Sequence, residues 1–145
     1  MKASVYLRQA YRLNMEIDSK LEQLEQLREL SVRIKPAFTG ERIMVTRDKS
    51  PMENAIIKVV MAEDEINKMI DKYVDLKAEI SVSIGQLDCF ESRILLELRY
   101  LGFNSWDEIA VKMNYRTSYI YKLHGRALQE LEKTMGGRNI EKSTR

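Results

Sequence analysis

The feature that most constrains this chain is a regular apolar pattern over residues 52–87. Apolar side chains recur there in strict alternation of four and three residues, interrupted only by Glu63 and Lys77. The positions of the pattern are Met52, Ile56, Val59, Glu63, Ile66, Ile70, Tyr73, Lys77, Ile80, Ile84 and Leu87. This heptad spacing predicts a long α-helix with one apolar stripe, as in a coiled coil. Its start is indicated by Ser50-Pro51-Met52-Glu53, a capping-box sequence with proline at the first helical position.

A second long helix is predicted over residues 4–34, which contain neither glycine nor proline. Its apolar positions follow a similar pattern, with Lys20 and Ser31 as polar exceptions, and they are Tyr6, Ala10, Leu13, Ile17, Leu24, Leu27 and Ile34. Pro36 ends this helix, and residues 35–49 are predicted to form a long loop. The two helices fit an antiparallel hairpin within one chain or a parallel dimer through the same stripes.

Composition excludes several classes of protein. The 145 residues include 2 prolines and 6 glycines, too few for a β-sandwich or barrel with many turns. One cysteine and one histidine leave no internal disulfide, no CxxC motif and no histidine metal cluster. No catalytic triad, paired-carboxylate site or phosphate loop is visible, so we expect a non-enzyme without a cofactor. No segment has the length and apolarity of a membrane span or signal peptide, so we expect a cytoplasmic protein.

Three shorter helices are predicted in the last third of the chain. Residues 88–101 form the first, with Gly102 at its end and with Phe90, Ile94, Leu95 and Leu98 buried. A capping box of Ser105 and Glu108 begins the second, whose apolar face holds Trp106, Ile109, Ala110 and Met113. The third begins near residues 116–118 and ends at Gly136-Gly137, with Ile120, Leu123, Ala127, Leu128 and Leu131 apolar.

Charge is unevenly distributed along the chain. The formal net charge is +2, but residues 112–145 carry eight basic and three acidic side chains. No acidic residue lies between Glu108 and Glu130. A basic end on a balanced chain is typical of a nucleic-acid contact.

A short helix, a tight turn and a longer basic helix form the pattern of a helix-turn-helix, whose second helix enters the major groove. The exposed positions expected early in that helix are Thr117, Ser118, Tyr119, Tyr121 and Lys122, with Arg116 and Arg126 at its edges. Hydroxyl, lysine and tyrosine side chains bind base edges or phosphates.

The run Glu108–Leu131 resembles region 4 of bacterial sigma factors without a gap, and Leu98-Arg99-Tyr100 matches an element that precedes it in that family. Trp106 and the run Leu123–Leu128 are more similar still to phage-encoded, sigma-region-4-like activators of late or packaging genes in Gram-positive hosts. The resemblance is specific over residues 88–131. It implies a helical N-terminal half, a DNA-binding C-terminal half and bacterial RNA polymerase as a partner.

By this resemblance, the DNA base contacts are Thr117, Ser118, Tyr121 and Lys122. Resemblance and charge together place the DNA phosphate contacts at Lys112, Arg116, Tyr119 and Arg126. Sigma factors favour an Arg-Glu pair where this chain has Thr117 and Ser118, so a −35 element need not be the target. His124 is interpreted either as a phosphate contact or as a packing residue, and Gly125 as a site of close helix packing.

The predicted fold is therefore all-α, with a two-helix coiled-coil-like region at 1–87, a helix-turn-helix domain at 88–135 and a basic flexible tail at 136–145. The predicted function is a sequence-specific transcriptional regulator, an activator of phage late genes that acts with host RNA polymerase. The N-terminal helices are expected to allow homo-oligomers. Two alternatives stay open: a small terminase-type DNA-packaging subunit, and a helical adaptor that binds RNA polymerase or a sigma factor without DNA.

Overall fold

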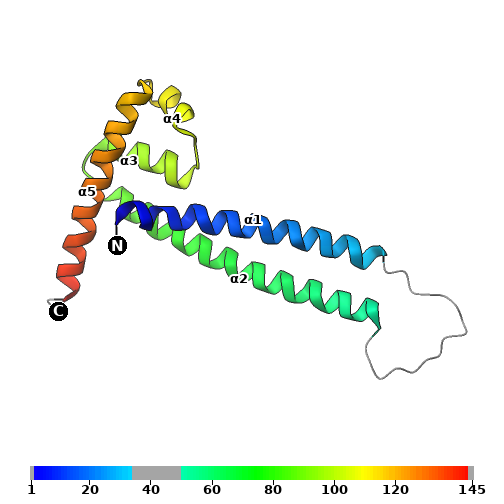
Figure 1. The fold of residues 1–145 in the computed structure, drawn as a ribbon. Coiled ribbons are helices and arrows are strands. Elements are labelled where there is room, and N and C mark those ends of the chain that lie inside the picture. The colour runs from blue at the N-terminus through cyan, green and yellow to red at the C-terminus, as the bar shows by residue number, and fades with distance from the viewer. Residues whose placement is uncertain (1, 34–49, 144–145) are drawn as a thin grey trace, which may run out of the picture. The chain divides into compact units, whose positions relative to one another are not determined.

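The computed structural model describes residues 2–33 and 50–143, and over these residues the chain is all-helical, with no β-strand (Figure 1). The described ranges contain five α-helices and one π-helical turn, in the order α1 (Ala3–Arg33), α2 (Pro51–Gly85), α3 (Phe90–Leu96), η1 (Glu97–Leu101), α4 (Trp106–Met113) and α5 (Thr117–Ser143). The all-α prediction is confirmed. None of the helices described is long and apolar enough to cross a membrane.

The two long helices have the predicted extents to within two residues. The Ser50 hydroxyl accepts a hydrogen bond from the backbone N–H of Glu53 at 3.2 Å, which confirms the predicted start of α2. The helix ends at Gly85, two residues before the last position of the apolar pattern. The predicted loop at 35–49 lies outside the described residues, as does Ile34.

The chain divides into two compact units that share these helices. A core unit comprises Met1–Asn14 and Tyr73–Arg145, and a two-helix unit comprises Met15–Lys72. The core unit therefore includes the first turns of α1 and the last turns of α2, whereas the sequence placed a domain boundary at residue 87.

Within the two-helix unit, α1 and α2 lie side by side and run antiparallel (Figure 1), and Arg28 forms an ion pair with Glu63 at 2.7 Å. Of the residues described in this unit, the buried hydrophobic ones are Ile17, Leu24, Ala55 and Ile66. Three other positions of the predicted apolar pattern, Met52, Ile56 and Ile70, are exposed. Two helices cover only a narrow stripe of each other, so part of the pattern remains uncovered.

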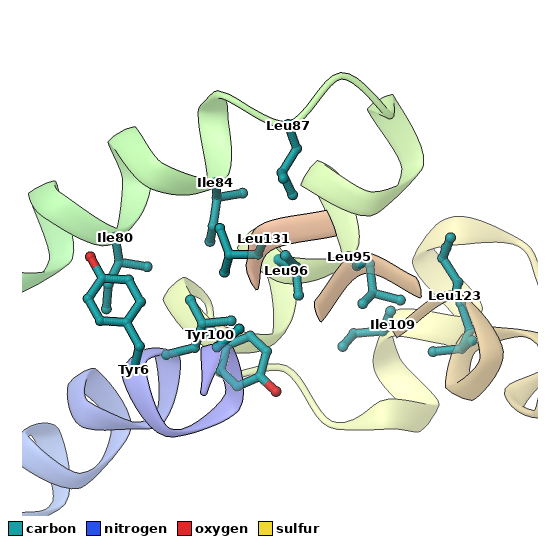
Figure 2. Packing of buried hydrophobic residues seen from close by; sticks show 14 of the residues in the cluster. Tyr6, Ile80, Ile84, Leu87, Leu95, Leu96, Tyr100, Ile109, Leu123 and Leu131 are labelled. Carbon is teal, nitrogen blue, oxygen red and sulfur yellow. The ribbon is translucent and has the colours of Figure 1, made fainter. Parts of the chain in front are cut away.

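The core unit packs apolar side chains from every helix around one centre (Figure 2). Leu7 of α1, Ile84 of α2, Leu95 of α3, Ile109 of α4 and Leu131 of α5 are all fully buried. Polar contacts fasten α1 to this core: the Ala3 backbone N–H donates to Glu132 Oε1 at 3.2 Å, and the hydroxyls of Tyr6 and Ser83 lie 3.4 Å apart.

The predicted helix at 88–101 differs from the structure in two ways. It begins at Phe90, and after Leu96 it changes to the π-helical turn η1, where the Gly102 N–H donates to the Glu97 carbonyl at 2.9 Å. The wider turn shifts the face of the helix, so that Tyr100 is buried and Leu98 is only half-buried.

The predicted burial of Phe90 is wrong, because its side chain is 66% exposed. It is the first residue of α3, where no earlier turn covers it, and its ring lies 5.9 Å from the Arg93 guanidinium. Ile94 is half-buried rather than buried, whereas Leu95 is buried as predicted.

The predicted end of the last helix at Gly136-Gly137 is also wrong, because α5 continues to Ser143. Glycine ends a helix by adopting a left-handed conformation, and no described glycine has a positive φ. Both glycines therefore stay in the right-handed helix, at a cost in helix propensity of about 1 kcal/mol each. The segment predicted as a tail is helical as far as Ser143.

Candidate nucleic-acid interface

The helix α4 is held at both ends by local contacts that the sequence encodes. The Ser105 hydroxyl accepts from the Glu108 N–H at 3.2 Å, and Glu108 Oε2 accepts from the Ser105 N–H at 3.1 Å. This confirms the predicted capping box. Asn114 ends the helix in a left-handed conformation with φ 59°, and residues 114–116 connect it to α5. Asparagine tolerates that conformation better than most residues.

The first turns of α5 have one buried and one exposed face. The buried face is apolar and consists of Ile120, Leu123, Ala127 and Leu131. The opposite face is exposed, and it consists of Ser118, Tyr121, Lys122, Gly125, Arg126 and Gln129. We call these six residues the α5 polar face. It carries two basic side chains and no acidic one.

Three of the four predicted base-contact residues belong to the α5 polar face. Ser118 and Lys122 are exposed, and Tyr121 is exposed with its ring centre 5.3 Å from that of Trp106. The fourth, Thr117, is half-buried. The structure thus brings Ser118, Tyr121 and Lys122 onto one surface and sets Thr117 at its edge.

Of the four predicted phosphate contacts, three are likewise exposed and one is half-buried. Lys112, Arg116 and Arg126 are exposed, and the Lys112 ammonium donates to Asn104 Oδ1 at 2.7 Å. Tyr119 is half-buried, and its hydroxyl takes part in internal hydrogen bonds. It donates to Glu91 Oε2 at 3.4 Å and accepts from Arg126 Nη2 at 3.3 Å.

Glu91 of α3 is a residue that sequence reasoning missed. Its carboxylate also accepts a hydrogen bond from the Tyr115 hydroxyl at 2.6 Å, and this bond raises the pKa of that hydroxyl. The rings of Tyr115 and Tyr119 lie 4.7 Å apart beside it. One acid therefore ties the connection between α4 and α5 to α3.

His124 has a packing role in this structure. Its Nε2 lies 2.7 Å from the Tyr100 hydroxyl, and its ring makes an edge contact with Trp106 at 4.6 Å. Burial, with help from Arg99 and Arg8, lowers the pKa of His124 to about 4. The imidazole is therefore neutral at pH 7, which does not favour the phosphate contact considered for it.

The surface of α5 has a shallow hollow of about 450 Å³ at Gly125, bordered by Tyr121, Lys122, Arg126 and Gln129. Apart from the nearby backbone of α5 itself, a Cβ atom added to Gly125 would meet no atom of the described residues within 4 Å. The interpretation of Gly125 as a site of close helix packing is therefore wrong, because the residue faces outward. Gln129 was missed, although its place eleven residues after Ser118 puts it on the same helical face.

The described residues contain no group of three or more His, Cys, Asp or Glu side chains placed to hold a metal ion. Cys89 precedes the first turn of α3 as a half-buried thiol, and hydrogen bonding with Ser92 lowers its pKa. No family model, curated protein or solved structure matched the chain.

Proposed function

We propose that this chain is a sequence-specific DNA-binding transcriptional regulator. In this proposal α4, residues 114–116 and α5 act as a helix-turn-helix, and the α5 polar face enters the major groove. The observation that carries the proposal is the exposure of Ser118, Tyr121 and Lys122 on one basic, acid-free surface at the start of α5.

The side chains of this face divide into two kinds of contact. Lys122 donates to guanine acceptors, and the Ser118 and Tyr121 hydroxyls and the Gln129 amide both donate and accept, which suits base edges. Arg126 with Arg116 and Lys112 surrounds them as exposed cations for the phosphate backbone. With several cations bound to phosphates, the affinity for DNA should fall steeply as the salt concentration rises.

Gly125 supports the same orientation. Glycine within a helix costs about 1 kcal/mol relative to alanine, and no contact with another described side chain requires glycine at this position. A helix without a side chain at that point allows the edge of a base pair or the sugar-phosphate backbone to approach the backbone of α5 closely.

The two-helix unit suits a protein partner. Val60 and Met61 of α2 are 57% and 66% exposed, and Leu30 of α1 is 54% exposed. Exposed apolar side chains of this size are common at interaction surfaces. We propose bacterial RNA polymerase or a second copy of this chain as that partner, and activation of phage late genes in the host cytoplasm as the biological setting.

The test is DNA binding by the full chain. Selection from random duplexes should give a preferred site, and titrations should then compare that site with unrelated DNA. Lys122→Ala should weaken the preferred site by about 5- to 150-fold and unrelated DNA much less, since loss of a base contact costs about 1–3 kcal/mol. Arg126→Ala should weaken both DNAs alike, and Lys58→Ala on the exposed surface of α2 should change neither.

A helical adaptor that binds polymerase without DNA is the second candidate, favoured by the exposed apolar side chains of the two-helix unit. Absence of duplex binding even at low salt, together with retained binding to RNA polymerase, would support the adaptor and reject the DNA-binding proposal. Equal losses on both DNAs for Lys122→Ala would remove that residue from base recognition.

A further inference from the structure

A cavity of about 800 Å³ lies in the core unit, between the first turns of α1, the turn η1, the start of α4 and the first turns of α5. It differs from the α5 polar face and contains none of its residues. Three arginines line it: Arg8 and Arg12 of α1 and Arg99 of η1. Aromatic rings make up much of the remaining wall, namely Tyr11, Tyr100, Phe103, Trp106 and His124.

Arg8 and Arg12 have no carboxylate partner in the described part of the chain, where the ion pairs join Arg28 to Glu25 and Glu63, and Lys68 to Asp64. The two arginines are one helical turn apart, so they share a face of α1. Among the described residues, the cavity wall includes one acid, Glu108, whose carboxylate already accepts the Ser105 N–H in the capping box. The cavity therefore has an excess of positive charge.

The positive charge acts on groups inside the cavity. After burial, Arg99 and Arg8 are the next causes that lower the pKa of His124 to about 4. Burial raises the pKa of the Tyr100 hydroxyl, so this group is also neutral at pH 7. Neither ring offsets the arginine charge, and an anion entering the cavity would do so.

The aromatic wall is held in place by specific contacts. The Arg99 guanidinium lies 4.3 Å from the Trp106 ring centre and donates from Nη1 to the Asn104 carbonyl at 3.0 Å. Phe103 has a left-handed backbone with φ 54°, unusual for a bulky residue, and its ring meets the Tyr11 ring edge-on at 5.7 Å. The loop thus places a large ring at the cavity wall at a cost in backbone strain.

From this combination we infer that the cavity binds a nucleoside phosphate, with Arg8 and Arg12 on the phosphate and the base against the rings of Tyr11 and Phe103. A guanidinium group forms bidentate hydrogen bonds with two phosphate oxygens, and nucleic-acid bases stack on aromatic side chains. The volume is far larger than a lone phosphate requires and accommodates a base and sugar as well. The nucleoside phosphate comes either from a free nucleotide or from a single-stranded nucleic acid.

Trp106 provides the measurement, because it is the only tryptophan of the chain and lines the cavity. The full chain is titrated with ATP, adenosine, inorganic phosphate and a single-stranded oligonucleotide while tryptophan fluorescence is recorded, and calorimetry repeats each titration. ATP or the oligonucleotide should cause a saturable change. Adenosine and phosphate alone should bind at least about tenfold more weakly, because each lacks half of the contacts.

Matched variants separate the cavity from general charge. Arg12→Gln should weaken ATP or oligonucleotide binding about tenfold or more, since it removes charge-assisted hydrogen bonds. Arg33→Gln, a change on the same helix away from the cavity, should leave binding unchanged. Tyr11→Ala should weaken ATP binding while leaving the binding of inorganic phosphate unaltered. Saturation by ATP identifies a free nucleotide, and saturation by the oligonucleotide alone identifies a single strand.

The inference is overturned if neither ATP nor the oligonucleotide binds at millimolar concentration, or if Arg12→Gln binds as tightly as the unmodified chain. It is also overturned if Arg12→Gln weakens only duplex DNA, because the arginines then belong to the duplex interface. Nucleotide binding without any duplex binding would reject the DNA-binding proposal and leave this inference standing.

Discussion

The core unit and the two-helix unit both consist of amphipathic helices, but they bury very different shares of their apolar side chains. The central hydrophobic cluster lies wholly in the core unit, where every helix contributes to it. Among its described residues, 15–33 and 50–72, the two-helix unit buries Ile17, Leu24, Ala55 and Ile66 but leaves ten large apolar side chains at least 36% exposed. Those side chains are Met15, Leu21, Leu30, Val32, Met52, Ile56, Ile57, Val60, Met61 and Ile70.

The difference shows that an apolar period determines helix formation, while neighbouring elements determine burial. In the core unit, α3, α4 and α5 supply further packing surfaces beside α1 and α2. In the described part of the two-helix unit, each helix has one neighbouring helix, so only the stripe facing that helix is covered. The stability of the core unit should therefore depend on its own packing, and that of the two-helix unit more on a partner.

The largest expected effect compares a leucine in each unit. Leu95 is fully buried, so Leu95→Ala should lower the free energy of unfolding by about 2–5 kcal/mol through lost transfer energy and a cavity. Leu30 is 54% exposed, so Leu30→Ala should change it by less than about 0.5 kcal/mol. Urea denaturation of both variants measures the difference. A comparable loss for Leu30→Ala would mean that a partner, such as a second copy, covers α1 in solution.

The second effect is a pH dependence that originates in the core unit. The pKa of His124 is about 4 in the folded chain and near 6.5 when unfolded, so the unfolded state takes up the proton first as pH falls. The contribution of neutral His124 to the free energy of unfolding should be fully present above about pH 6.5 and should be lost as the pH falls towards 4. The loss should be roughly 1–2 kcal/mol once partial exposure of the ring is allowed for.

Denaturation midpoints between pH 7 and pH 5 test this for the unmodified chain and for His124→Gln. The variant should show a flatter profile because it cannot take up that proton. Identical slopes for the two proteins would place the source of the pH dependence elsewhere.

Much of the helical layout could be predicted because its signals are local. Ser50 and Ser105 lie next to the N–H groups they cap, so both helix starts follow from a few residues of sequence. The exposed positions Ser118, Tyr121 and Lys122 followed from the helical period of the buried residues between them.

The features that were missed depend on residues distant in the chain. Tyr119 is engaged by Glu91, and the cavity brings Arg8 and Arg12 beside Arg99, which no local pattern contains. The π-helical turn at Glu97–Leu101 similarly accompanies the burial of Tyr100 in the common core. Tertiary packing, rather than helix propensity, determined these features.

The smallest expected effect compares the two serine caps. Ser105→Ala removes a complete capping box in the core unit and should cost about 1 kcal/mol. Ser50→Ala removes a hydrogen bond of the same length from the start of α2. Because the end of this helix can fray locally without unfolding the core unit, the substitution should lower the free energy of unfolding about half as much. Denaturant midpoints measure both, and Thr at either position should retain most of the cap. An equal cost would show that the two helix starts are equally well anchored.

The early residues of α1 belong to the same core as α5, and this determines when the protein can fold during synthesis. Ala3 and Leu7 are fully buried, and the Ala3 N–H is bonded to Glu132, 129 positions later. Contacts of such long sequence separation form late, because the intervening chain must first be made and closed. The long helices should therefore leave the ribosome with their core-facing side chains uncovered, and protection from aggregation should begin only when α5 has emerged.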